Sequence, residues 1–258
     1  MDHRIGIAAF NSRIAVVSTC ERTLTALERF LLPSLPRIAL DMPGTAIELR
    51  ILRKGDGFQL ICGGRIEPAR DFPALVSAAV RLLDEEIVRR LTSLTAVHAG
   101  AVELRGKALL LPGKSHAGKS ALVAELLRRG AVYFSDEYAL IDDRGRAHPY
   151  PRPLLLRNGG PEQVPVLPEE CHARVGNLPV AVGWILALEY DPAASWRIAA
   201  IPQSEALLLL LQNTPHELRE APRIFPALGR AASGSGCYAG RRNGAPEAAD
   251  QILRLVAG

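Results

Sequence analysis

Residues 113–120 carry the residue types and the spacing of a phosphate-binding loop. They fit the pattern G-x-x-x-x-G-K-[ST], with Gly113, Gly118, Lys119 and Ser120 at its specified positions. Glycines let the backbone fold closely around a polyphosphate, and successive N–H groups form a cradle for the anion. In such a loop the lysine reaches the β- and γ-phosphates, and the hydroxyl ligates Mg²⁺. The residues predicted to bind the nucleotide are Gly113, Lys114, Ser115, His116, Ala117, Gly118, Lys119, Ser120 and Ala121.

The segments on either side of the loop strengthen this prediction. The apolar stretch 108–111 is typical of a buried strand, and 121–129 is typical of a helix. A strand, a glycine-rich loop and a helix N-terminus in this order bring partial positive charge to the phosphates. The alternative is an ordinary glycine-rich turn between a strand and a helix, and the flanking pattern favours the nucleotide site.

Two adjacent acids, Asp136 and Glu137, follow the next predicted strand at 131–134. A right-handed crossover should place that strand beside the strand that leads into the loop, so both acids would open onto the phosphate site. Successive strand residues point to opposite sides of a sheet. We therefore expect one acid to accept a proton from an attacking hydroxyl while the other holds the metal. The alternative is a pair of surface acids at a strand end.

His98 precedes the loop by two short predicted strands. An imidazole at this place could tune a neighbouring carboxylate or bind phosphate. A single histidine is more often a structural residue with satisfied hydrogen bonds, so its spacing alone leaves both roles open.

The chain reads as two regions, 1–92 and 93–258. The first is β-rich: hairpins are expected at 4–18 and 46–62, with a helix at 23–32 and a long helix capped by Asp71. It carries no motif that indicates chemistry. In the second region we expect strands at 96–104, 107–111, 131–134, 138–141 and 180–190, an irregular Pro-rich stretch at 149–168, helices at 121–129, 204–212, 215–231 and from 247, and a linker turn at 234–236.

Composition argues against several classes of protein. The formal net charge of +4 over 258 residues is mild, and Lys and Arg are spread along the chain, so we expect no nucleic-acid partner. The cysteines are scattered without a C-x-x-C pair, which argues against a zinc site or a disulfide framework. The N-terminus lacks the shape of a signal peptide, and the longest apolar run, 206–211, is too short to span a bilayer. We expect a cytoplasmic protein without a membrane partner.

Taken in order, these motifs resemble the catalytic domain of the HPr kinase/phosphorylase family. The shared pattern runs from His98-Ala99-Gly100 through the loop and Arg129-Gly130 to Phe134-Ser135-Asp136-Glu137, and covers residues 98–137. Relatives include kinases that tailor lasso-peptide precursors. The resemblance implies an α/β fold with a P-loop kinase core of the HPr kinase and phosphoenolpyruvate carboxykinase type, with a mixed sheet. It also implies a kinase that uses ATP and Mg²⁺ to phosphorylate a serine of a peptide or small protein.

The resemblance also implies roles for individual residues. Asp136 matches the catalytic base, with Lys119 and His98 as the other catalytic residues. Glu137 matches the second acid, near Mg²⁺, so that Ser120, Glu137 and Asp136 are the residues expected at the metal. Because relatives assemble through their kinase domains, a homo-oligomer is a further expectation.

Other positions match the family less closely. Arg152 and Arg157 are candidates for contacts with the γ-phosphate, or else solvated loop arginines. Glu137 stands where true HPr kinases have a second Asp, and His116 stands at a loop position that is usually Gly. The Arg-Gly-Leu-Gly segment associated with HPr recognition is absent, so the substrate is expected to differ from HPr. A serine kinase acting on a peptide, a small-molecule kinase and a nucleotide-dependent regulatory module stay open as functions.

Overall fold

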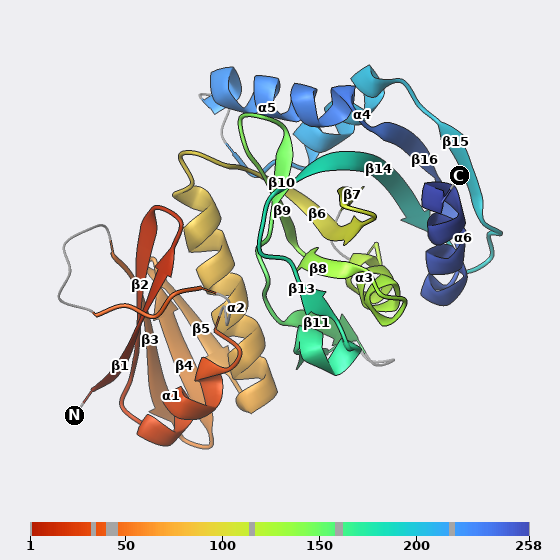
Figure 1. The fold of residues 1–258 in the computed structure, drawn as a ribbon. Coiled ribbons are helices and arrows are strands. Elements are labelled where there is room, and N and C mark those ends of the chain that lie inside the picture. Colours follow the sequence, from red (N-terminus) through yellow and green to blue (C-terminus); the bar gives the residue numbers. More distant parts are fainter. Residues whose placement is uncertain are drawn as a thin grey trace. The chain divides into compact units, whose positions relative to one another are not determined.

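A computed structural model describes residues 2–31, 35–39, 46–113, 117–157, 162–216 and 220–257 (Figure 1). The chain divides into two compact units. Unit 1 comprises Met1–Thr92 and Leu155–Leu167, and unit 2 comprises Ser93–Leu154 and Pro168–Gly258. Both contain helices and strands, and the sheets are mixed, so the predicted α/β class is confirmed.

Unit 1 is built on a five-stranded sheet with the order β1-β2-β3-β4-β5. Its strands are β1 (His3–Ala9), β2 (Ser12–Ser18), β3 (Ala46–Lys54), β4 (Gly57–Cys62) and β5 (Arg65–Ala69). The two predicted hairpins are confirmed as the antiparallel pairs β1–β2 and β3–β4, while β2 and β3 pair in parallel. The helix expected at 23–32 is α1 (Glu21–Glu28), and β5 was not predicted.

Helix α2 (Phe72–Arg89) follows the sheet of unit 1 and begins where the sequence places it. The Asp71 side chain accepts a hydrogen bond from the Ala74 N–H at 2.9 Å, and a proline lies in the first turn. Strands β11 (Leu154–Arg157) and β12 (Gln163–Val166) form a small separate sheet, and β12 lies against α2. The prediction that 149–168 is irregular was therefore wrong, because this stretch contains two paired strands.

In unit 2, the long strands β6 (Thr95–Leu104) and β14 (Val180–Tyr190) change partners along their length. The start of β6 pairs with β9 (Tyr138–Ile141), and the rest pairs with β7 (Lys107–Pro112) on one side and β8 (Val132–Ser135) on the other. Strand β14 pairs first with β10 (Arg146–His148), then with β7 and with β16 (Gly236–Arg242). The remaining strands are β13 (Arg174–Val175), beside β8, and β15 (Arg197–Ala200), beside β16.

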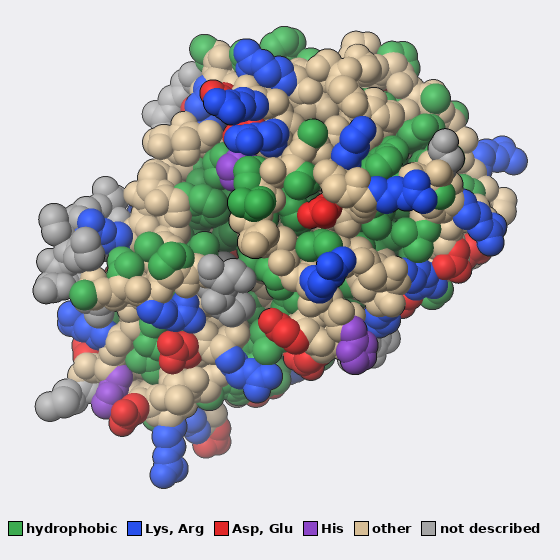
Figure 2. All heavy atoms as spheres, viewed as in Figure 1, with side chains coloured by type: hydrophobic (Ala, Val, Ile, Leu, Met, Phe, Trp, Pro, Cys, Tyr) green, Lys and Arg blue, Asp and Glu red, His purple; other side chains and the backbone are tan. Residues whose placement is uncertain are grey.

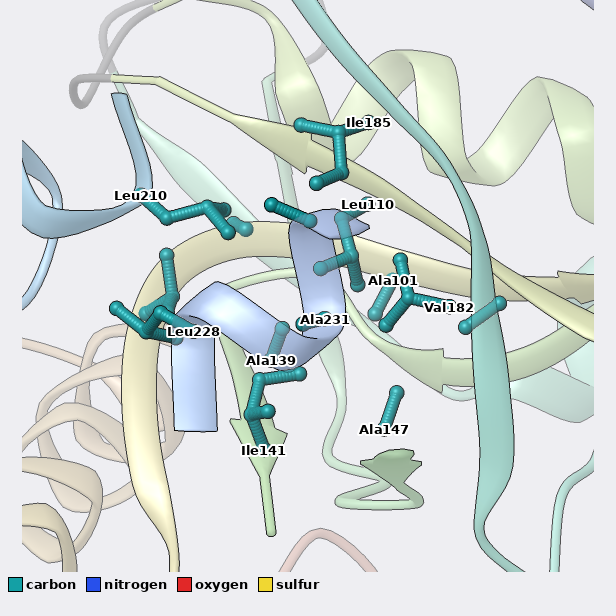
Figure 3. Close-up of a cluster of buried hydrophobic side chains, with 14 of the residues drawn as sticks. Ala101, Leu110, Ala139, Ile141, Ala147, Val182, Ile185, Leu210, Leu228 and Ala231 are labelled. Carbon is teal, nitrogen blue, oxygen red and sulfur yellow. The ribbon is translucent and has the colours of Figure 1, made fainter. Parts of the chain in front are cut away.

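The core of unit 2 lies between its sheet and two helices, α4 (Gln203–Gln212) and α5 (Ala221–Ser233) (Figure 3). Leu110 of β7 and Ile185 of β14 pack in one buried cluster with Leu210 of α4 and Leu228 of α5. Successive strand residues face opposite sides, so the residues that alternate with this cluster face the other side of the sheet.

Helix α3 (Lys119–Arg128) packs on that other side of β6, and α6 (Ala245–Ala257) packs against α3. A Cβ at Gly100 would come within 2.8 Å of Val123 Cγ2, so a glycine there lets α3 approach the strand. Helix α5 starts six residues after the predicted start at 215. The segment 234–236 was read as a linker turn, but Gly236 is the first residue of β16.

Within the described part of the chain, no helix combines the length and apolar character needed to cross a membrane. On the face drawn in Figure 2, Lys and Arg side chains are scattered among acidic and apolar ones rather than gathered in one patch. The cysteines at positions 20, 62, 171 and 237 form no disulfide.

Candidate active site

The predicted phosphate loop connects β7 to α3. Gly118 is the N-cap of α3, with φ 71° and ψ 24°, a left-handed conformation that glycine adopts at little cost. Lys119, Ser120 and Ala121 form the first turn of the helix. The predicted contacts of Lys114, Ser115 and His116 lie outside the described residues.

Lys119 is buried, and its side chain reaches back to the end of β7. Its Nζ donates a hydrogen bond to the carbonyl oxygen of Gly113 at 2.8 Å. Burial lowers the pKa of Lys119, and the negative charges of Glu137 and Asp136 oppose this effect. The lysine of the loop and both predicted acids therefore lie near enough to one another to interact electrostatically.

His98 and Glu137 form a hydrogen-bonded pair next to the loop. The distance between His98 Nε2 and Glu137 Oε1 is 2.8 Å, and their side chains are 18% and 34% exposed. Burial raises the pKa of Glu137, but the hydrogen bond to His98 and the charges of Arg152, His98 and Lys119 outweigh burial, so the net shift of this pKa is downward. Glu137 is thus held as a carboxylate that solvent can reach.

Backbone hydrogen bonds attach the loop and the acid to the same strand. The Gly113 N–H donates to the carbonyl oxygen of His98 at 3.4 Å, and the Ala99 N–H donates to that of Glu137 at 3.0 Å. The prediction that His98 belongs with the acids and the loop agrees with this geometry.

Asp136 is in a different environment from its neighbour. Its side chain is 1% exposed, and Oδ1 accepts a hydrogen bond from Arg152 Nη1 at 3.0 Å. The Tyr133 hydroxyl lies 3.2 Å from the same oxygen and 3.0 Å from the Arg152 carbonyl oxygen. The other carboxylate oxygen, Oδ2, is buried and has no hydrogen-bond partner among the described residues.

The strand order corrects one expectation about the acids. Strand β8, which precedes Asp136, was expected beside β7, but β6 lies between them and pairs antiparallel with both. Two strands that are antiparallel to the same neighbour run in the same direction, so β7 and β8 still end at the same edge of the sheet. The crossover spans one intervening strand and still brings the acids to the loop.

The two arginines proposed as γ-phosphate contacts have different locations. Arg152 is buried in the ion pair with Asp136, so it holds the acid in place. Arg157 is an exposed residue of β11 and belongs to unit 1. It is therefore not among the residues that unit 2 brings together.

Arg242 is a residue near the loop that the sequence did not reveal. Its Nη2 donates hydrogen bonds to the carbonyl oxygens of Ala117 and Gly118, both at 2.9 Å. It is the last residue of β16, a strand that was not predicted, and it lies 124 residues from Gly118 in sequence. No local pattern could have linked them.

The residues at the loop fit a magnesium ion bound together with a nucleotide. The described residues contain no cluster of three or more His, Cys, Asp or Glu side chains that could hold a metal alone. Mg²⁺ usually binds through one or two carboxylates, waters and substrate phosphates, and all these ligands are oxygens. The Ser120 hydroxyl, Glu137 and the unpartnered Oδ2 of Asp136 supply such oxygens.

Compared with known proteins, the chain matches no family model. A search of curated proteins likewise found no significant match.

Proposed function

We propose that the protein is an ATP-dependent phosphotransferase with a P-loop kinase core of the HPr kinase type. The observation that carries this proposal is the electrostatic grouping of Lys119 with Glu137 and Asp136 where β7 and β8 end. A module that only senses nucleotide needs no carboxylates beside the lysine, whereas phosphoryl transfer to an alcohol uses a proton acceptor.

The loop and its lysine bind and orient the nucleotide in this proposal. The N–H groups of the first turn of α3 and the Lys119 ammonium contact the β- and γ-phosphates, so Nζ gives up its hydrogen bond to the Gly113 carbonyl for phosphate oxygens. Ser120 and Asp136 would hold Mg²⁺, which neutralises charge on the phosphates when it is bound.

Glu137 is the better placed of the two acids to accept the proton. Asp136 matches the base by resemblance, but its carboxylate is 1% exposed and paired with Arg152, whereas the Glu137 side chain is 34% exposed and contacts His98. In the transfer step the serine O–H bond breaks and its proton passes to Glu137. A bond forms from the serine oxygen to the γ-phosphorus, and the bond from that phosphorus to ADP breaks. Asp136, held by Arg152, would help to hold the metal.

The proposed acceptor is a serine of a peptide or small protein, with a lasso-peptide precursor as the first candidate. Incubation with labelled ATP and candidate peptides, followed by mass spectrometry, tests the proposal. We expect phosphoserine on the peptide. Label on small metabolites alone would instead indicate a small-molecule kinase, and binding of ATP without any transfer would indicate a regulatory module.

Two isosteric variants distinguish the acids. Glu137→Gln should reduce transfer by roughly 10²–10⁴-fold, the usual contribution of a general base, while ATP affinity stays near that of the wild type. Asp136→Asn should retain more activity than Glu137→Gln and should change the Mg²⁺ concentration needed for half-maximal rate. The reverse order of activities would return the role of base to Asp136.

A further inference from the structure

Arg242 reaches the phosphate loop because three parallel strands end at one edge of the sheet. Strand β14 pairs in parallel with β7 on one side and with β16 on the other. The loop follows the end of β7, and Arg242 is the last residue of β16. The register therefore delivers this side chain to the loop across β14.

The Arg242 guanidinium is fixed from several directions. Nη2 donates to the carbonyl oxygens of Ala117 and Gly118 at 2.9 Å, and Nη1 donates to that of Asn243 at 2.9 Å. Its Cζ lies 5.2 Å from the centre of the Tyr190 ring, within cation–π distance. The residue is 2% exposed, so its position is set by these contacts rather than by solvent.

Among the described residues, Arg242 has no carboxylate within ion-pair distance. Its hydrogen bonds go to backbone carbonyls, and the Tyr190 side chain contacts it through the face of its ring. Burial lowers the pKa of Arg242, which reflects the cost of holding a cation away from water. Buried charges are as a rule paired, and the groups that compensate this one are the backbone carbonyls of Ala117, Gly118 and Asn243.

We propose that Arg242 is a positioning residue of the phosphate loop, which it shapes for nucleotide phosphates by holding the carbonyls of Ala117 and Gly118. In a trans peptide the C=O of one residue and the N–H of the next point in opposite directions. Holding these two carbonyls therefore turns the N–H groups of Gly118 and Lys119 away from the guanidinium. These N–H groups are among those that would cradle the phosphates, so the inference rests on the proposed function.

The glycine at the N-cap is matched to this contact. A Cβ at Gly118 would lie 2.5 Å from Arg242 Nη2, and φ is 71° there. The loop position thus requires glycine both for its backbone conformation and for the close approach of the arginine. The Gly118 carbonyl also accepts the Leu122 N–H at 3.1 Å, so the same contact joins the loop to the first turn of α3.

Titration of the full-length protein with MgATP tests the role of Arg242. The variants are Arg242→Met, which removes every N–H donor of the side chain, and Arg242→Lys. The lysine keeps the positive charge but lacks the planar guanidinium that can donate to several carbonyls at once. The matched control is Arg241→Met, because the neighbouring Arg241 is exposed and pairs with Glu189. We expect the Kd to rise roughly 10- to 100-fold in Arg242→Met, as for loss of hydrogen bonds from a charged donor, to rise less in Arg242→Lys, and to be unchanged in the control.

Chemical rescue separates positioning from a merely structural role. Methylguanidine at millimolar concentration should restore part of the ATP affinity of Arg242→Ala and leave that of Arg241→Ala unchanged. If Arg242→Met fails to fold, Arg242→Lys and the rescue experiment still provide the measurement. If the wild-type protein binds ATP and Arg242→Met and Arg242→Lys bind it with the same affinity, the inference is overturned while the proposed function stands.

If the wild type bound no ATP, the proposed function would fall instead. Hydrogen exchange of the Leu122 amide in the nucleotide-free protein would then still test the contact. We expect faster exchange at Leu122 in Arg242→Lys than in the wild type. Unchanged exchange would remove the positioning role as well.

Discussion

Replacing Arg152 by Met should destabilise unit 2 by about 3–5 kcal/mol, the usual cost of leaving one charge of a buried ion pair without its partner. Arg152 Nη1 lies 3.0 Å from Asp136 Oδ1, and the two side chains are 2% and 1% exposed. In the variant the carboxylate keeps the Tyr133 hydroxyl at 3.2 Å, and one neutral donor cannot replace a guanidinium in a buried site.

Removing both charges should recover most of this loss. Exchange of a buried ion pair for apolar residues of similar volume is often neutral or stabilising by about 1–4 kcal/mol, so we expect Arg152→Met/Asp136→Leu to be more stable than either single variant. The Tyr133 hydroxyl keeps an acceptor in the double variant, because it lies 3.0 Å from the backbone carbonyl of residue 152. The coupling free energy from the double-mutant cycle should therefore be several times that of an exposed pair, which is about 0.2–1 kcal/mol.

Urea unfolding followed by tryptophan fluorescence measures this quantity. Trp184 and Trp196 are the two tryptophans of the chain, and both belong to unit 2, so their emission reports on that unit. The control is Arg241→Met, which breaks an ion pair whose side chains are 62% and 67% exposed and should cost less than about 1 kcal/mol. A loss below about 1 kcal/mol in Arg152→Met, or single losses that simply add in the double variant, would refute the idea of a tightly coupled buried pair.

Four further substitutions test other parts of unit 2. Lys119→Ala should weaken ATP binding by at least about 10-fold, measured by calorimetry, because it removes a cation from the phosphates; unchanged affinity would contradict the loop assignment. Gly145→Ala should cost about 1–3 kcal/mol in urea unfolding, because φ is 76° and the new Cβ would lie 2.6 Å from the Ala231 nitrogen. Gly106→Ala, at φ 75° with open space around it, should cost less. Burial lowers the pKa of His216, which accepts the Ala96 N–H on Nε2. The unfolded chain therefore takes up the proton first, and stability should fall as pH drops below about 6.5. His216→Asn should flatten this fall, and an equal slope in both proteins would exclude His216 as its source.

Features fixed by short-range patterns were readable in the sequence. Asp71 at the start of α2 accepts a backbone N–H three residues later, as its position before an apolar, helix-spaced stretch predicts. The turn around Gly55 joins β3 and β4 as expected. The strand and the helix that flank the predicted phosphate loop were likewise readable, because β7, the left-handed Gly118 and α3 follow one another closely in sequence.

Features that depend on distant partners were not readable. Strand β16 contains Gly236 and Gly240, and glycine weakens a strand signal. Gly240 pairs with Ile198 of β15, and a Cβ there would collide with the Arg197 carbonyl. The close approach of β15 therefore requires glycine at position 240. The same glycine weakens the sequence signal that would have predicted β16. Because Arg242 reaches the loop only through this strand, its role was hidden for the same reason.

The position of β6 between β7 and β8 explains how the loop and the acids can act together in the proposed reaction. If β8 lay directly beside β7, the strand that pairs with β8 and positions the acids would not be β6, the strand that carries His98. Instead, the His98 carbonyl accepts the Gly113 N–H, its imidazole contacts Glu137, and the next residue, Ala99, donates to the Glu137 carbonyl. One strand therefore holds Gly113, the His98 imidazole and Glu137 in a single register. A substitution that displaces β6 should therefore disturb both Gly113 and Glu137.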